Sequence, residues 1–155
     1  MRDPRLPSSL DLPQYPKALG STVAELQPLL SPEAVFSKQK FSMWTPEVAA
    51  HVAAVRPGFT DAILCGIEAH VCVQQTALEL LAQGKRCWVV VDGVSSQRAG
   101  DRAVALQLMR DAGAFLTTTE SLIFGLLGGA DAPDFKPVQR LLMDTYLKQG
   151  ASALL

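Results

Sequence analysis

Residues 62–72 read AILCGIEAHVC, and this stretch decides the fold. Its first part, residues 62–67, is a continuous apolar run without polar alternation, which is typical of a parallel β-strand buried on both faces. A helical segment from about residue 69 to 82 follows almost directly, and Gly84 ends it. A second apolar run at residues 87–91 comes next. The order strand, helix, strand with short links predicts a βαβ unit with parallel strands.

Helix and strand signals alternate on both sides of this unit. Before it, residues 35–36 form at most a short strand, and Thr45-Pro46-Glu47 opens a helix that stops before Pro57. After it, the pattern predicts a helix near 100–111, a strand at 115–117, a helix opened by Thr119-Glu120 and a last helix over about 133–148. This alternation predicts an α/β fold with a three-layer, Rossmann-like parallel sheet.

Length and charge restrict the classes of protein. A chain of 155 residues with 48% hydrophobic residues is long enough for one real core and short for two complete domains. Fourteen basic and fifteen acidic side chains leave a net charge of -1, which predicts neither a nucleic-acid nor a membrane partner. A small-molecule substrate or a protein partner fits this balance better.

The N-terminal residues and the cysteines indicate a compartment. Residues 1–16 contain four prolines and no apolar run that would serve as a signal peptide or membrane span, so we expect a cytoplasmic protein. The cysteines at 65, 72 and 87 form no C-x-x-C motif and are odd in number, which indicates free thiols. We place Cys65 and Cys87 inside buried strands. No G-x-G-x-x-G motif or P-loop lysine is present, so we expect no nucleotide and no other cofactor.

Cys72 lies where an open α/β sheet places its ligands, beyond the carboxyl end of a strand. In the first turn of a helix, its thiol faces the positive end of the helix dipole and unpaired N–H groups, and both favour the thiolate. The alternative is that Cys72 is a small apolar residue that packs the helix against the sheet.

Several separated motifs resemble those of the isochorismatase-like cysteine hydrolases, and the resemblance runs from Gln14 to about Leu142. The motifs occur in the family's order and are QYPKALGST (14–22), KQKFSM (38–43), GIEAHVCVQQTALELL (66–81), VVDGVSSQ (90–97), DRAVAL (101–106) and GAFLTTTES (113–121).

The resemblance implies a role for each matching residue. Cys72 corresponds to the nucleophile that attacks an amide or similar carbonyl carbon. Lys38 corresponds to the lysine of the family's Cys-Lys-Asp triad, although without the resemblance it reads as a surface cation. The backbone N–H groups of Glu68 and Cys72 correspond to the oxyanion hole. The family also has a cis peptide at the step that corresponds to Ile67–Glu68.

The pocket and metal assignments are more limited. Nicotinamidase relatives bind zinc through an Asp and paired His residues, whereas this sequence contains only His51 and His70, so we expect no metal site. His70, Asp92 and Ser95 are candidates for the border of the pocket. A locally hydrogen-bonded histidine and turn capping explain the same residues equally well.

The third triad member, an aspartate in a D-x-Q motif that ends the family's first strand, has no counterpart here. We therefore expect an N-terminally truncated domain, with an irregular proline-rich arm at 1–13, an incomplete hydrolase domain at 14–150 and a tail at 151–155. In the family's strand order, 3-2-1-4-5-6, the absent strand is a central neighbour of the 62–67 strand. Its loss would leave backbone groups without partners.

Two functions remain after this reading. The first is a cysteine hydrolase that acts on a small amide or ester-like substrate, with activity impaired by the missing aspartate. The alternative is a non-catalytic binding or oligomeric module derived from the same fold. Because family members commonly form dimers or larger assemblies, we expect a homo-oligomer in either case.

Overall fold

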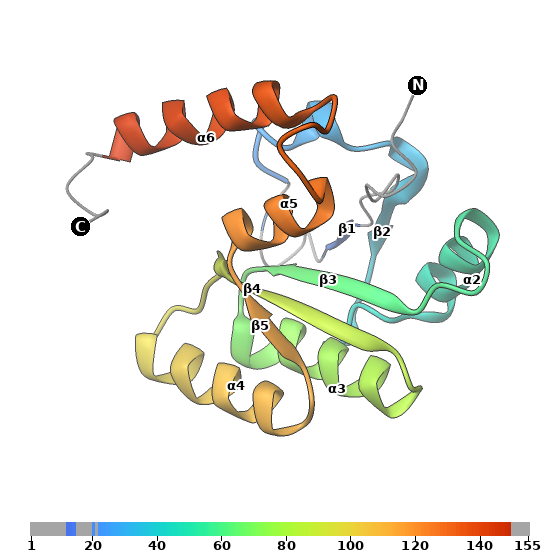
Figure 1. Ribbon diagram of the computed structural model, residues 1–155. Helices are drawn as coiled ribbons and strands as arrows, with labels where there is room; N and C mark the ends of the chain where they lie inside the picture. The colour runs from blue at the N-terminus through green and yellow to red at the C-terminus, as the bar shows by residue number, and fades with distance from the viewer. Residues whose placement is uncertain (1–11, 15–19, 21, 150–155) are drawn as a thin grey trace. The chain divides into compact units, whose positions relative to one another are not determined.

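The computed structural model describes residues 12–14, 20 and 22–149, and Figure 1 shows its elements. The chain divides into two compact units, Met1–Thr117 and Thr118–Leu155, which are treated separately below. The first unit contains the βαβ core and every site residue that the sequence predicts. The predicted arm at 1–13, apart from Leu12 and Pro13, and the predicted tail lie outside the described residues.

The main sheet of the first unit has three parallel strands in the order β3-β4-β5. They span Asp61–Gly66, Arg86–Val94 and Phe115–Thr117. In the register, Leu64 lies opposite Val89, and Val89 lies opposite Leu116. The predicted βαβ unit is thus confirmed, although β4 extends three residues beyond the apolar run because its pairing with β3 continues past a bulge to Val94.

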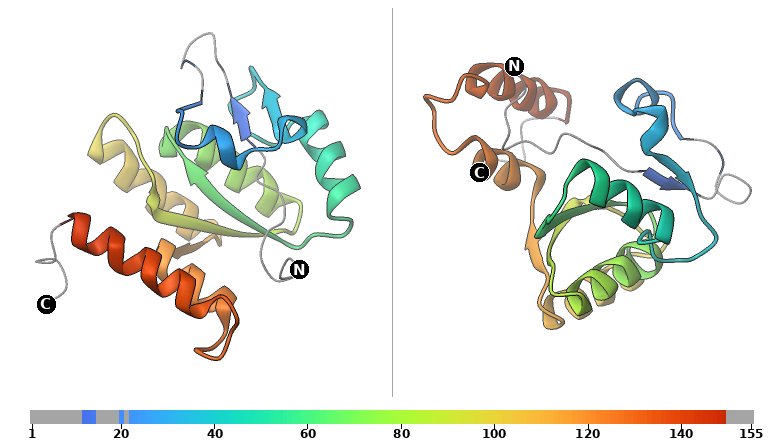
Figure 2. Two further views of the ribbon diagram at one scale, coloured as in Figure 1. Left: turned by 90° about the horizontal axis from the view of Figure 1, so that it is seen from above. Right: turned by 90° about the vertical axis from the view of Figure 1, so that its right-hand side faces the viewer.

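Two helices cover one face of this sheet (Figures 1 and 2). A short π-helical segment, Ala69–Val73, leads into α3, Gln74–Ala82, and α4 spans Ala99–Asp111. Their inward side chains form the core with the sheet, and the core cluster includes Leu64, Val73, Ala77, Leu80, Cys87, Val89, Ala105 and Met109. The predicted helices at 69–82 and 100–111 are confirmed.

A second, two-stranded sheet precedes this core. Its parallel strands are β1, Leu12–Gln14, and β2, Val35–Ser37. Strand β1 contains Pro13, which cannot donate to a ladder and is compatible with a strand at the edge of a sheet. Leu12 and Pro13 therefore lie in a strand, whereas the sequence predicts an irregular arm at 1–13. Two 3-10 turns, Gln27–Leu29 and Pro32–Ala34, lead into β2.

Helix α2, Pro46–Val55, begins as the sequence predicts. The Oγ1 of Thr45 accepts a hydrogen bond from the N–H of Val48, Pro46 occupies the first turn, and Glu47 adds an acidic group there. Thr45 thus provides an acceptor for an unpaired N–H group, and proline is suited to the first turn of a helix. The negative charge of Glu47 lies near the positive end of the helix dipole.

The expected burial of β3 was wrong. Only Leu64 of this strand is buried, Cys65 is exposed and Ile63 is 37% exposed. Within the described residues, β3 pairs with β4 alone and so lies at the edge of its sheet. An apolar run of this kind reads as a central strand, but among the described residues one edge of β3 is not paired and part of one face is exposed. Cys87, by contrast, is fully buried as expected.

The second unit contains two helices. Helix α5, Thr119–Leu127, begins after Thr118, whose Oγ1 accepts from the N–H of Ser121, and ends at Gly128 in the left-handed conformation. Helix α6 spans Phe135–Gln149. Both predicted helices are confirmed, and the last one begins and ends within two residues of the predicted bounds. Among the described residues, none of the helices is long and apolar enough to cross a bilayer.

The core makes a first prediction. Met109 is completely buried, whereas its neighbour Leu108 on the same helix is 40% exposed. Replacing Met109 by alanine leaves a cavity, so Met109→Ala should lower the free energy of unfolding by about 2–5 kcal/mol. The control Leu108→Ala should cost less than about 1 kcal/mol. Urea denaturation measures both, and equal losses would contradict the assigned core.

A second prediction concerns pH and the start of the sheet. Hydrogen bonds from Arg86, Thr60 and Trp88 lower the pKa of the Asp61 carboxyl to about 2, against an ordinary value of 3.8. The folded state therefore gains stability from ionised Asp61 above about pH 4, and loses it as the pH falls through about 2. Asp61→Asn should flatten this acid loss. Urea midpoints at pH 7 and pH 2.5 test it, and an unchanged pH slope would count against the ion pair.

Candidate active site

The turn after β3 places Cys72 at the carboxyl end of the sheet. Gly66 ends the strand with φ of 140°, and Glu68 follows in the left-handed conformation with φ of 56°. Such values favour glycine at the first position and cost roughly 1–3 kcal/mol for a glutamate at the second. The chain then enters the π-helical segment that contains Cys72, a rare form that is frequent at functional sites.

Backbone hydrogen bonds hold this turn against the end of β4. The N–H of Ser95 donates to the carbonyl of Gly66 at 3.1 Å, and the N–H of Ala69 donates to the carbonyl of Ser95 at 2.7 Å. Ala69 is completely buried. These contacts compensate for the strain at Glu68, because a turn with a relaxed Glu68 would lose these buried hydrogen bonds.

Lys38 and Cys72 come together although 34 residues separate them. The Nζ of Lys38 lies 3.6 Å from the Sγ of Cys72, and both residues are half-buried. The ammonium also donates to the carbonyls of Lys40 and Phe41, at 2.9 and 3.0 Å. An ammonium has three donors, so each of its N–H groups has an acceptor. The half-buried site thus brings a cation into contact with the sulfur.

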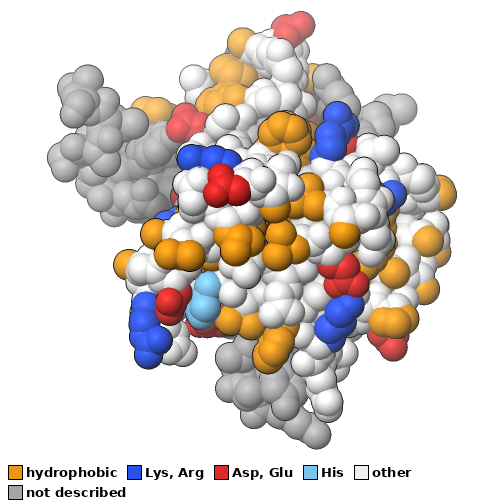
Figure 3. Space-filling view, turned by 90° about the horizontal axis from the view of Figure 1, so that it is seen from below, with side chains coloured by type: hydrophobic (Ala, Val, Ile, Leu, Met, Phe, Trp, Pro, Cys, Tyr) orange, Lys and Arg blue, Asp and Glu red, His pale blue; other side chains and the backbone are white. Residues whose placement is uncertain are grey.

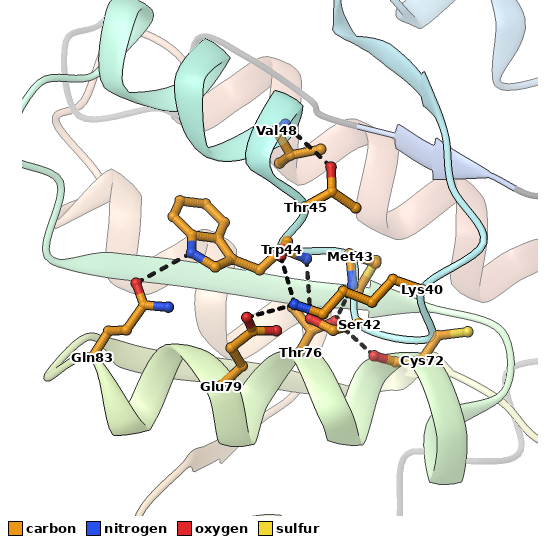
Figure 4. A network of polar contacts seen from close by, with 10 residues as sticks. All are labelled: Lys40, Ser42, Met43, Trp44, Thr45, Val48, Cys72, Thr76, Glu79 and Gln83. Carbon is orange, nitrogen blue, oxygen red and sulfur yellow. Dashed lines mark hydrogen bonds and ion pairs between the residues drawn. The ribbon is translucent and has the colours of Figure 1, made fainter.

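The loop from Lys38 to Thr45 is held to α3 by polar contacts (Figure 4). Nζ of Lys40 lies 2.6 Å from Glu79, and Nε1 of Trp44 donates to Gln83 at 3.2 Å. Desolvation opposes ionisation of Glu79, but hydrogen bonds from Lys40 and Ser42 outweigh it and lower the pKa of this carboxyl. These contacts attach the loop that carries Lys38 to the helix that follows Cys72.

Two buried hydroxyls complete this junction. The Oγ1 of Thr76 accepts from the N–H of Met43 at 2.7 Å and donates to the carbonyl of Cys72 at 2.6 Å. The Oγ of Ser42 accepts from the N–H of Trp44 at 3.1 Å. Sequence reasoning did not select either hydroxyl, although Thr76 was visible as a polar residue on the apolar side of a helix, one turn after the cysteine.

The expected oxyanion hole is only partly available. The N–H of Cys72 donates to the carbonyl of Glu68 at 3.0 Å, so the structure does not present it as a free donor. A tight helical turn explains this, since the N–H of Val71 points to the same carbonyl at 2.9 Å. Among the described residues, the N–H of Glu68 forms no hydrogen bond. Its role in binding an oxyanion remains a prediction.

The expected cis peptide between Ile67 and Glu68 is not present. Every peptide bond in the described residues is trans. The chain instead makes the sharp change of direction through the left-handed conformation of Glu68, which is the one non-glycine residue with positive φ among those described. This conformation costs less than a non-proline cis bond.

The structure places the three candidate pocket residues near the same edge. Nδ1 of His70 lies 3.0 Å from Oγ of Ser96 and 3.5 Å from a Glu68 carboxylate oxygen, and its Nε2 lies 3.9 Å from Asp101. Asp92 lies inside β4, not after it, and is exposed. Ser95 is exposed and contributes the backbone contacts described above. A locally bonded His70 is thus confirmed, and the pocket roles stay predictions.

The described residues contain no group of three or more His, Cys, Asp and Glu side chains arranged to hold a metal ion. His51 is half-buried, because its ring packs edge-on against Phe36 at 5.3 Å. In the same part of the chain, no carboxylate forms an ion pair with Lys38.

Comparison with known proteins identifies the family. The model of the isochorismatase domain matches residues 12–121. This chain belongs to the isochorismatase domain family. Isochorismatase domain-containing protein 2 of Bos taurus is 46% identical over 142 residues, which cover 91% of this chain and 67% of the relative. Isochorismatase domain-containing protein 1 of Salmo salar is 45% identical over 137 residues, which cover 88% of this chain and 48% of the relative.

Other relatives carry different names. A secreted isochorismatase effector of Phytophthora sojae is 45% identical over 134 residues, with 84% of this chain and 64% of the relative covered. The solved structure of the MAR1 ribonuclease of Caenorhabditis elegans is 47% identical in sequence and has a TM-score of 0.75. The match includes 83% of this chain and 66% of the ribonuclease chain. The chain thus spans about half to two thirds of the length of these isochorismatase domain relatives.

More distant structures share the fold alone. The YcaC protein of Escherichia coli, described as an octameric hydrolase, is 23% identical with a TM-score of 0.69. The nicotinamidase of Bacillus subtilis is 19% identical with a TM-score of 0.56. These likenesses confirm the predicted α/β class and the isochorismatase-like architecture.

The contact between Lys38 and Cys72 makes a third prediction. Removing the ammonium should slow alkylation of Cys72 by iodoacetamide at pH 7 about tenfold, which corresponds to about 1.4 kcal/mol of lost stabilisation of the sulfur anion. The measurement compares Lys38→Met with Lys85→Met, whose Nζ instead donates to the Phe59 carbonyl. Both variants should carry Cys65→Ser, because Cys65 is exposed, whereas buried Cys87 has its pKa raised to about 11 by desolvation. An equal effect of the two lysine variants would refute a specific contact.

Proposed function

We propose that this chain carries the nucleophile and the lysine of a cysteine hydrolase that acts on a small amide or ester-like substrate. The observation that carries the proposal is the 3.6 Å contact between the Nζ of Lys38 and the Sγ of Cys72 at the carboxyl end of the sheet. A nucleophile next to a group that promotes its ionisation is the pattern expected for covalent catalysis.

The proposed reaction has two steps. Sulfur attacks the carbonyl carbon, a C–S bond forms, and the C–N or C–O bond of the substrate then breaks as the leaving group takes a proton from the Lys38 ammonium. Water next attacks the thioester, the C–S bond breaks, and the proton from water returns to Lys38. One water molecule is consumed, and an acid and an amine or alcohol are released.

We expect this chain to turn over slowly by itself. Giving up a proton from an ammonium is unfavourable at neutral pH, and hydrolases of this kind use a carboxylate to share that task. Among the described residues Lys38 has no carboxylate in ion-pair contact. A missing positioned acid or base typically lowers a rate about 100- to 10,000-fold. Acylation of Cys72 should therefore be easier to observe than steady turnover.

The partners and the compartment follow from other features. Helix α4 exposes apolar side chains, with Val104 69% and Leu108 40% exposed. Figure 3 shows apolar side chains among polar and charged ones on the lower face of the molecule. Such a surface supports association with a second copy of the chain. The three cysteines are free thiols, which supports a reducing compartment such as the cytoplasm.

One related structure is that of a protein named MAR1 ribonuclease, so RNA is a second substrate to test. The net charge of -1 supplies no excess of cations for a polyanion, so we favour the small neutral substrate. A structured RNA incubated with the chain serves as the second substrate in the assay below. Cleavage of the RNA that survives Cys72→Ala would favour a different function for this fold.

The experiment that tests the proposal measures acylation and turnover together. With 4-nitrophenyl acetate as the ester and 4-nitroacetanilide as the matched amide, we expect one acetyl group on Cys72 by mass spectrometry and a burst of 4-nitrophenol. Cys72→Ala should abolish both, whereas Cys65→Ala, which removes an exposed thiol outside the contact, should retain them. An adduct on Cys65 alone, or none together with retained self-association, would instead support a non-catalytic module.

A further inference from the structure

The side chain of Thr76 links the nucleophile to the loop that carries the lysine. It lies one helical turn after Cys72 and is 3% exposed. Its hydroxyl donates to the carbonyl of Cys72 at 2.6 Å and accepts from the N–H of Met43 at 2.7 Å (Figure 4). One side chain thus bonds the backbone of the nucleophile to the loop, five residues after Lys38.

Burial makes this link stronger than the others across the junction. The ion pair between Lys40 and Glu79 has side chains that are 48% and 30% exposed, so water and salt weaken it. The hydrogen bond from Trp44 to Gln83 lies at the exposed far end of α3. A hydroxyl that is excluded from water, by contrast, leaves unpaired buried groups on both sides when it is lost.

The loop itself transmits this constraint to the ammonium. Lys38 Nζ is bonded to the carbonyls of Lys40 and Phe41, which immediately precede the Ser42-Met43 segment held by Thr76. Displacing Met43 therefore displaces the acceptors of Lys38. Attraction between the ammonium and the sulfur anion falls as their separation grows.

We propose that Thr76 is a positioning residue that sets the distance between the Lys38 ammonium and the Cys72 sulfur. This inference rests on the proposed function, since it assigns a role in preparing the same nucleophile. Thr76 acts through the backbone of Cys72 and Met43 and does not touch the substrate.

The test is a double-mutant cycle on the rate of Cys72 alkylation at pH 7, with Cys65→Ser present throughout. Thr76→Val, which keeps the shape, should lower the rate about tenfold, and Thr76→Ser should keep it within about twofold of the parent. In the Lys38→Met background, Thr76→Val should have almost no further effect, because the group that it positions is already absent.

Thr45→Val is the matched control. This threonine is also buried, at 7% exposure, but its hydroxyl caps α2 and contacts neither Cys72 nor Met43. It should lower the melting temperature without changing the alkylation rate. Thr76→Ala provides a second variant that removes the same two hydrogen bonds if the valine does not fold.

The outcomes separate the two proposals. A parent rate no faster than that of Lys38→Met would refute the proposed contact and with it the function. A fast parent whose rate Thr76→Val or Thr76→Ala leaves unchanged, or lowers equally with and without Lys38, would overturn the role of Thr76 alone.

Discussion

The parallel pairing of β3 with β4 is the constraint on which the site depends. It brings the carboxyl ends of both strands to one edge, where the backbone of Ser95 bonds to Gly66 and Ala69. These hydrogen bonds hold Glu68 in a left-handed conformation that the residue would not adopt by itself. The π-helical segment and Cys72 follow directly from that turn. Without the ladder, the strain would relax and the thiol would lose its place above the sheet.

The second constraint joins segments that are distant in the sequence. Lys38 directly follows strand β2 of the other sheet, and its ammonium is satisfied by two carbonyls and one sulfur. The loop after it is fastened to α3 by the buried hydroxyl of Thr76 and by more exposed contacts. Because the buried contacts lose more free energy when broken, they determine the geometry, and the exposed ion pair adds little.

Among the described residues, strand β3 pairs on one side only. A run such as residues 62–67 is suited to burial on both sides, yet Ile63 and Cys65 are exposed here. Within the described residues, the neighbouring positions on that edge are not filled by a strand. An exposed edge of this kind presents N–H and C=O groups with which another strand can pair.

The sequence by itself determined the local elements and the position of Cys72. Apolar runs, the Thr45-Pro46-Glu47 start and the glycines after helices are short-range signals, and they predicted the βαβ unit and Cys72 in its turn. Through family resemblance it also selected Lys38. Only the tertiary structure decided the contact of Lys38 with Cys72, the exposure of Cys65, the trans bond before Glu68 and the hydrogen bonds of Thr76. Burial and long-range hydrogen bonds depend on which segments lie side by side in the fold, and local sequence patterns do not determine this.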